Sequence, residues 1–246
     1  MKKAWFRKKS VTMWLEIGLA AALVLCLGVA GTKGKKSSEI QPGKEVVRQT
    51  EETAKQVKDT PKETEEVIAA GQYPIMGKSS VTEEDMIRYF QASGKAYPAD
   101  ALAKGGAESL ETFCRIYIEE AEAEGIRPEV AFAQTMKETG FLQYGGDAAI
   151  EQFNFAGLGT TGGGVPGNSY PDVRTGVRAQ IQHLKAYATT DVLSQACVDE
   201  RYEYVIKGSA PYVEWLGKNE NPEGQGWATA EGYGYSIVEM IQKMKG

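Results

Sequence analysis

The stretch Ser109–Gly140 reads SLETFCRIYIEEAEAEGIRPEVAFAQTMKETG, and it decides the fold because it predicts two consecutive helices. Apolar residues recur at the i, i+3, i+4 and i+7 spacing over Leu110–Ala121, and acidic residues occupy most of the other face. Gly125 ends this first helix. Proline fits the first turn of a helix, so Pro128–Thr139 is predicted as the second one. The domain around them is therefore predicted to be mainly helical.

Three more helices are predicted outside this stretch. Thr82 is a good N-cap for a helix that runs to about Ala92, with Asp85 in the capping-box position. Apolar periodicity marks a helix from about Thr175 to Ala188, and the chain closes on a helix over Ser236–Met244. We also expect Cys197 to lie in a helix between these two.

The helical periodicity vanishes between Gly140 and Arg174. Residues 157–167 hold six glycines and one proline, which predicts a long loop or a glycine-rich hairpin. Residues 157–162 match the GxGxxG dinucleotide fingerprint, but no apolar strand precedes them and no helix can start after them. We therefore expect no nucleotide cofactor, and we expect this long irregular stretch to be functional.

The first thirty residues predict a membrane anchor. Five Lys and Arg residues precede an apolar run over Val11–Ala30, and about 20 residues suffice to cross a bilayer as a helix. The basic flank predicts a cytoplasmic N-terminus, with the rest of the chain outside. A cleaved signal peptide is the alternative, although its apolar core is usually shorter. Residues 31–70 are polar and predict a flexible stalk, which leaves 71–246 as the folded domain.

Charge and composition exclude several functional classes. Residues 71–246 carry 15 basic and 24 acidic residues, a net charge of −9 that disfavours nucleic acid and suits neutral glycan. His183 is the only histidine, so a two-histidine metal site is excluded and a structural role is expected for it. Cys114 lies on an apolar face and is expected in the core. Its spacing to Cys197 does not decide whether the two form a disulfide.

Glu138 is the carboxylate with the most distinctive position. It occupies the last turn of the predicted helix Pro128–Thr139, where it faces the negative end of the helix dipole. That position, together with burial against Phe141, should raise its pKa and favour the protonated acid. Protonation of a glycosidic oxygen requires such a group, whereas an ordinary solvated surface glutamate is the alternative.

Four motifs in one order give the chain a resemblance to a known family. The segment Ala131–Phe141, AFAQTMKETGF, resembles the Q-x-x-x-E-[ST]-G-[WF] signature of the bacterial glucosaminidases of glycoside hydrolase family 73. Gln152–Leu158 resembles the N-N-x-F-G-[IL] block of that family, and Gly176–Tyr187 resembles the helix that follows it. Trp227–Ile237 resembles the closing W-A…Y-[AG]-x-x-I element, so the resemblance covers roughly residues 75–246.

The resemblance implies a lysozyme-like α+β fold, mainly helical with a small Gly-rich β-lobe, preceded here by the predicted N-terminal membrane helix. It implies cleavage of cell-wall glycan after N-acetylglucosamine, without a metal or a cofactor. By the same resemblance Glu138 is the general acid, and Asn154 and Tyr233 support the site or the sugar.

The identity of a second catalytic acid stays open. Family members often carry one some thirty to forty residues after the first, and Asp172 is the only acid between Gln152 and Asp191. Asp172 is therefore predicted as the second catalytic residue, although it can equally cap the next helix. Glu151 is the other contender, and the 2-acetamido group of the substrate can replace a second carboxylate in some glycosidases.

Three functions fit the sequence. The first is an endo-β-N-acetylglucosaminidase that acts on peptidoglycan strands, attached to the cell membrane by a single span with its domain outside, or secreted if the span is cleaved. The second is a lytic transglycosylase or muramidase of the same fold. The third is a non-catalytic glycan-binding module, which would have no need for an acid at the end of a helix.

Overall fold

Six α-helices and four 3-10 helices lie within residues 67–246, the part of the chain that the computed structural model describes. In chain order they are α1 (Glu83–Ala92), α2 (Ala99–Leu102), η1 (Ala103–Gly105), α3 (Leu110–Glu124), α4 (Pro128–Thr139), η2 (Ile150–Gln152), α5 (Val173–Ala188), η3 (Tyr202–Tyr204), η4 (Val213–Leu216) and α6 (Tyr233–Lys245). The predicted anchor, residues 1–30, and most of the predicted stalk lie outside the described residues. None of the helices that the structure describes is long and apolar enough to cross a membrane.

The caps confirm the predicted start of α1 and the predicted ends of α3 and α4. Thr82 and Asp85 form a complete capping box at the start of α1. Gly125 and Gly140 end α3 and α4 in the left-handed conformation, with φ of 74° and 58°. Helix α5 begins two residues before the predicted Thr175, and α6 begins three residues before the predicted Ser236.

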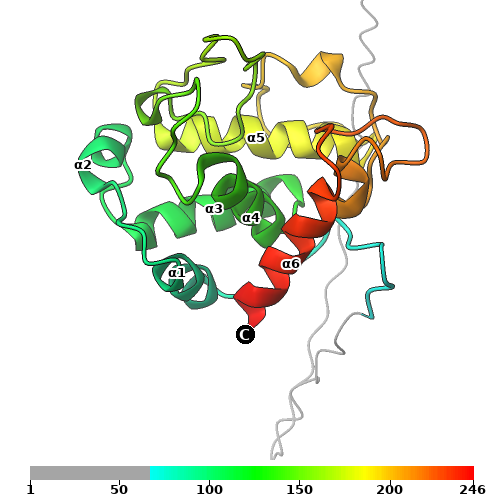
Figure 1. Cartoon of the computed structure of the whole chain (residues 1–246), viewed down its shortest axis with the longest axis horizontal. Helices are drawn as coiled ribbons and strands as arrows, with labels where there is room; N and C mark the ends of the chain where they lie inside the picture. The colour runs from blue at the N-terminus through cyan, green and yellow to red at the C-terminus, as the bar shows by residue number, and fades with distance from the viewer. Residues whose placement is uncertain (1–66) are drawn as a thin grey trace, which may run out of the picture. The chain divides into compact units, whose positions relative to one another are not determined.

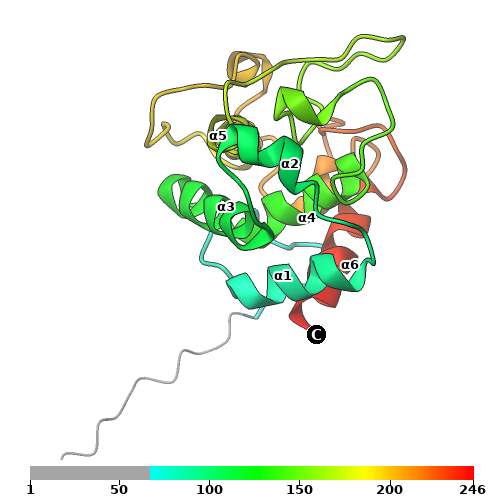
Figure 2. The same cartoon turned by 90° about the vertical axis from the view of Figure 1, so that its left-hand side faces the viewer.

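Helix α4 is the central element of the domain. It contacts α3, α5 and α6, and α3 also contacts α1 and α5. The pair α3 and α4 lies between α5 on one side and α1 and α6 on the other (Figure 1, Figure 2). Ten of the twelve residues of α4 are buried, so only Lys137 and Glu138 in its last turn reach the surface.

An aromatic cluster fills the space between α3, α4 and the Gly-rich segment. Phe113 contacts Tyr117 and Phe155 with ring centroids 5.1 and 5.2 Å apart, and Phe132 of α4 packs against Tyr117 at 5.7 Å. Cys114 is fully buried beside them, as predicted, and it is a free cysteine. Edge-to-face packing of this kind adds to the free energy of burial, so the cluster fixes α4 against α3.

The Gly-rich segment between Gly140 and Asp172 is a series of turns rather than the expected β-lobe. Its only β pairing in the described structure is the isolated bridge between Gly162 and Val165, and its only helix is η2. All six glycines of residues 157–167 have positive φ, a conformation that reverses the chain direction and cannot extend a strand. The mainly helical prediction is therefore confirmed, whereas the β content of the lobe is limited to this bridge.

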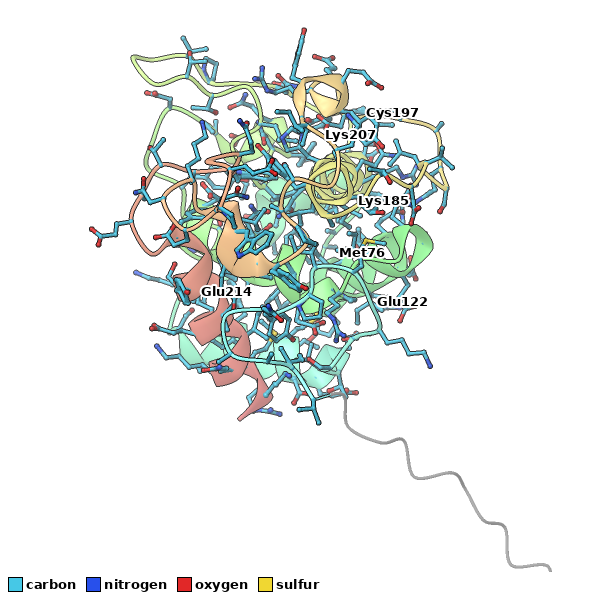
Figure 3. The ribbon with its side chains drawn as sticks, turned by 90° about the vertical axis from the view of Figure 1, so that its right-hand side faces the viewer. Met76, Glu122, Lys185, Cys197, Lys207 and Glu214 are labelled. Carbon is cyan, nitrogen blue, oxygen red and sulfur yellow. The ribbon has the colours of Figure 1, made fainter. Side chains whose placement is uncertain are left out.

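The prediction that Cys197 lies in a helix is wrong. It lies in the loop between α5 and η3, with Lys207 just beyond η3 (Figure 3). Buried side chains of the helices accept hydrogen bonds from the main chain of this loop. The N–H groups of Ser194 and Gln195 donate to the Glu124 carboxylate, and the Val198 N–H donates to the side chain of Gln182. These long-range bonds replace the local bonds that a helix would need. Cys197 is a free cysteine too.

Candidate active site

A cleft of about 880 Å³ opens where the end of α4 meets the Gly-rich segment. Three groups of residues line it. They are the end of α4 and the turns after it (137–140, 144 and 146–148), the Gly-rich turns (154 and 156–160), and a wall formed by His183, Tyr187, Arg201, Lys218, residues 226–230 and Tyr233. Segments that are far apart in the sequence therefore build one groove.

Glu138 lies in this cleft, at the exposed end of the otherwise buried helix α4. The chain turns sharply after it, because Gly140, Phe141 and Leu142 all have positive φ. Thr139 braces this turn: its hydroxyl accepts a 2.8 Å hydrogen bond from the Leu142 N–H and donates one to the Thr135 carbonyl. Backbone strain of this kind is common next to functional groups.

The pKa of Glu138 is raised above its ordinary value, as predicted. The main cause is desolvation by the surrounding protein, which disfavours the carboxylate. A hydrogen bond from the Tyr233 hydroxyl and the charge of Lys137 oppose the rise. The result is a carboxyl group that keeps its proton to higher pH than a solvated glutamate does, while it remains accessible from the cleft.

A buried chain of hydrogen bonds fixes the partner of Glu138. The Tyr233 hydroxyl donates to Glu138 Oε1 and accepts a 3.1 Å bond from the side-chain amide of Gln134. Gln134 Oε1 accepts in turn from Gln180 of α5 at 2.9 Å, and Gln180 accepts from Tyr117 of α3. Each link in this chain joins side chains of two different helices, so α3, α4, α5 and α6 together orient the hydroxyl that faces Glu138.

Tyr233, which the resemblance assigns to the site, is thus the hydrogen-bond partner of Glu138. Its side chain is buried, and its pKa lies well above the ordinary value because burial disfavours the phenolate. Tyr233 thus stays a hydrogen-bond donor to Glu138 across the pH range of protein function.

Asn154 lines the cleft, but its side-chain polar atoms form hydrogen bonds with the Gly-rich turns. Its amide donates to the carbonyls of Leu158 at 2.8 Å and Asn168 at 3.1 Å, and its oxygen accepts from the Leu158 N–H. The side chain is buried. Its arrangement indicates a brace that holds the floor of the cleft next to Glu138.

The wall that includes His183, Tyr187 and Trp227 is aromatic. His183 packs edge-to-face against Trp227, with ring centroids 4.7 Å apart, and Tyr187 lies 5.8 Å from the same indole. His183 Nδ1 lies 2.7 Å from the buried carboxylate of Asp199. These contacts give His183 the structural role that was expected, and they position the indole at the cleft.

Neither candidate for the second acid lines the cleft. Asp172 is the N-cap of α5, where its carboxylate accepts a 2.7 Å hydrogen bond from the Thr175 N–H. Glu151 lies exposed in η2. The structure thus brings Glu138, Tyr233 and Asn154 to one cleft and leaves Asp172 at a helix end.

Asp147 is the cleft residue that sequence reasoning missed. Besides Glu138, it is the only carboxylate among the described residues that line the cleft, and it is exposed to solvent there. It follows Glu138 by only nine residues, and the positive-φ turns after Gly140 connect the two residues within one cleft lining. Within residues 67–246, no group of three or more His, Cys, Asp and Glu side chains is arranged to hold a metal ion.

A curated relative matches part of the chain. A protein of Borreliella burgdorferi, described as uncharacterized, is 39% identical over 104 residues, which cover 42% of this chain and 51% of that protein. The chain thus spans about half the length of this curated relative. No solved structure matches the chain significantly.

The family comparison covers more of the chain. The family model described as Glucosaminidase, mannosyl-glycoprotein endo-beta-N-acetylglucosaminidase, matches residues 114–246, from α3 to the end of α6. The matched region contains Glu138, Tyr233 and every residue that lines the cleft. The resemblance found in the sequence is confirmed, and the chain belongs to the glucosaminidases of glycoside hydrolase family 73.

Proposed function

We propose that this protein is an endo-β-N-acetylglucosaminidase that hydrolyses peptidoglycan strands after N-acetylglucosamine, with Glu138 as the general acid. The observation that carries the proposal is the placement of Glu138. Its pKa is raised by desolvation, it is accessible from the cleft, and a hydroxyl held by four helices faces it. Family membership supports the reaction class.

Glu138 acts first in the proposed mechanism. Its proton passes to the glycosidic oxygen as the bond to the anomeric carbon breaks, and the leaving sugar departs as an alcohol. Glu138 becomes a carboxylate in this step. The Tyr233 hydroxyl donates to that carboxylate, which stabilises the charge at the moment it forms. Gln134 keeps the hydroxyl in this direction by donating to its oxygen.

Asp147 is our candidate for the water step. Water must attack the anomeric carbon and lose a proton, and a carboxylate in the same cleft can accept that proton. Asp147 has this position, whereas the carboxylate of Asp172 holds the start of α5. If the 2-acetamido group of the substrate attacks first, Asp147 serves only to orient that group or the later water.

We also propose that residues 1–30 attach the protein to the cell membrane with the cleft on the outer side. The support is the sequence pattern alone, with five basic residues followed by a long apolar run. The full chain should then sediment with membranes, and a chain that starts at residue 71 should stay soluble and keep its activity. A full chain that stays in the soluble fraction contradicts the attachment.

Product analysis tests the proposed reaction. Purified peptidoglycan digested by the protein should release fragments with N-acetylglucosamine at the new reducing end, and the Glu138→Gln variant should release none. Reducing-end or anhydro muramic acid would identify a muramidase or a lytic transglycosylase instead. Binding to peptidoglycan without release of fragments would identify a non-catalytic module.

A further inference from the structure

The cleft lining carries more positive than negative charge, unlike the domain as a whole. Residues 71–246 carry a net charge of −9, yet the charged residues that line the cleft are three cations and two carboxylates. Lys137 stands next to Glu138 and lies over the Tyr233 ring, 5.4 Å from its centroid. The other two cations, Arg201 and Lys218, lie away from Glu138 in the sequence and come from two separate loops.

Arg201 is half-buried at the cleft wall. Its guanidinium lies 5.3 Å from the centroid of the Tyr204 ring, and its main-chain N–H donates to Asp199 at 2.9 Å. Asp199 is already the partner of His183. Within residues 67–246 no carboxylate lies within ion-pair distance of the guanidinium. Half-buried arginines usually have such a partner, so this group can accept an external anion.

Lys218 stands on the other loop of the same wall. Its main chain pairs with Ala228, since the Lys218 N–H donates to the Ala228 carbonyl at 2.8 Å. Its side chain is exposed, and in the described part of the chain it too has no carboxylate within ion-pair distance. The loop that pairs with it carries Trp227, so the backbone of Lys218 is held beside the aromatic wall.

The aromatic wall links these two cations to the reaction site. Tyr187 donates to the Gly226 carbonyl at 3.3 Å, and its ring lies 5.8 Å from Trp227. Arg201, Tyr187 and Tyr233 all line this one cleft. An aromatic face is a common surface for a sugar ring. A saccharide on this wall would therefore extend from Glu138 towards the cations.

We propose that Arg201 and Lys218 bind a free carboxylate of the peptide carried by a sugar next to the one that is cleaved. This inference rests on the proposed function and adds the substrate class: glycan that still carries acidic peptides, rather than bare glycan. Peptidoglycan is the glycan in which alternate sugars carry peptides with free carboxylates. Arginine recognises a carboxylate through two parallel hydrogen bonds, and lysine adds a point charge.

A matched pair of substrates tests this site. Peptidoglycan is stripped of phosphate-containing polymers, and half of it is treated so that its carboxylates become neutral amides. The wild-type KM should be about tenfold higher on the amide form, because the loss of one hydrogen bond to a charged group weakens binding by about this factor. The kcat should be similar on both forms, because the carboxylate does not take part in the reaction.

Variants locate the effect at the two cations. Arg201→Gln and Lys218→Met should raise KM on the acidic substrate about tenfold at unchanged kcat and should show little difference between the two substrates. Arg201→Lys and Lys218→Arg keep the charge and should recover part of the loss. Lys243→Gln removes an exposed cation from α6, outside the cleft lining, and should leave the preference for the acidic substrate intact.

Several results would overturn the inference. A wild type that does not distinguish the two substrates has no site for a carboxylate. Equal losses on both substrates in Arg201→Gln assign a structural role to the side chain. A preference that appears only on wall material that retains its phosphate polymers assigns the site to phosphate. The proposed function fails separately, if the wild type releases no reducing-end N-acetylglucosamine from either substrate.

Discussion

The two sides of the cleft hold their carboxylates in opposite ways. Glu138 extends from the end of α4, a helix buried on nearly all sides, and a hydrogen-bonded tyrosine faces it. Asp147 extends from exposed turns within a segment that has no strand and one short 3-10 helix in the described structure. In the proposed mechanism, the group whose pKa must be controlled lies on the rigid side, which is the buried helix α4. The carboxylate that we propose for the water step lies on the adaptable side, which consists of the exposed turns.

A constrained connection joins the two sides. Phe141, Leu142 and Tyr144 all have positive φ, which is uncommon for residues with side chains. Leu142 is buried and Tyr144 donates to the Asn154 carbonyl, so this connection is tied both to the core and to the Gly-rich turns. It brings Asp147 back to the groove that Glu138 faces.

The largest expected effect is on the rigid side. Glu138→Gln should lower kcat at least about a hundredfold, because the amide cannot donate a proton to the leaving oxygen. The raised pKa means that the folded state holds the Glu138 proton, so this contribution to stability is present at low pH and lost as pH rises through the raised pKa. The variant lacks that loss, and its melting temperature at neutral pH should be no lower than that of the wild type.

Reducing-end assays and thermal melts at several pH values measure both expectations. Near-normal turnover in a folded Glu138→Gln protein would remove Glu138 from the mechanism. Turnover that is lost together with the fold would show only that Glu138 supports the structure.

The next effect is on the adaptable side. Asp147→Asn should lower kcat about tenfold or more. This loss is small for a general base, because an exposed carboxylate is held loosely. Glu151→Gln is the matched control, since Glu151 is exposed on the same segment but outside the cleft lining. Steady-state kinetics on solubilised glycan measure both variants. Full activity in Asp147→Asn would assign the attack to the 2-acetamido group of the substrate.

The sequence predicts the rigid side well, because its signals are local. The spacing of apolar residues from Leu110, the Pro128 start and the glycines that end α3 and α4 are all short-range features. The position of Glu138 in the last turn follows directly from them. The raised pKa of Glu138 follows from burial, which the sequence also predicts, and the structure adds the tyrosine that limits the rise.

The remaining features depend on contacts that no short window contains. Tyr233 lies 95 residues after Glu138, and its bond to Gln134 spans 99 residues. Asp147 reaches the cleft through three residues in a conformation that composition does not reveal. The segment around Cys197 is a loop and not the predicted helix, because its main chain donates to the buried carboxylate of Glu124. The same carboxylate pairs with Lys185 at 2.8 Å. Tertiary contacts decided each of these points.

A smaller effect is expected at Tyr233, whose hydroxyl both lowers the pKa of Glu138 and donates to the carboxylate that forms in the reaction. In the proposed mechanism activity needs protonated Glu138, so activity should fall as pH rises through the Glu138 pKa. The hydrogen bond from Tyr233 lowers that pKa, so Tyr233→Phe should move the alkaline limb of the kcat profile to higher pH. It should also lower kcat at the optimum about tenfold, since a bond to the developing carboxylate is lost.

A pH–rate profile of Tyr233→Phe beside Tyr235→Phe measures this shift. Tyr235 lies on the same helix, is 49% exposed and is not part of the cleft lining. Its variant should keep the wild-type profile. An alkaline limb that stays in place or moves to lower pH in Tyr233→Phe would contradict the role of the hydroxyl in tuning Glu138.

The smallest expected effect concerns Asp172, and it separates capping from catalysis. Its carboxylate accepts the Thr175 N–H at the start of α5, so Asp172→Ala should cost about 1 kcal/mol of stability. Asparagine caps helices about as well as aspartate, so Asp172→Asn should restore the stability. Both variants should keep most of the wild-type kcat. A catalytic carboxylate behaves in the opposite way, because asparagine cannot accept the proton. A large loss of kcat in Asp172→Asn at an unchanged melting temperature would therefore identify Asp172, at the start of α5, as the second catalytic acid in place of Asp147 in the cleft.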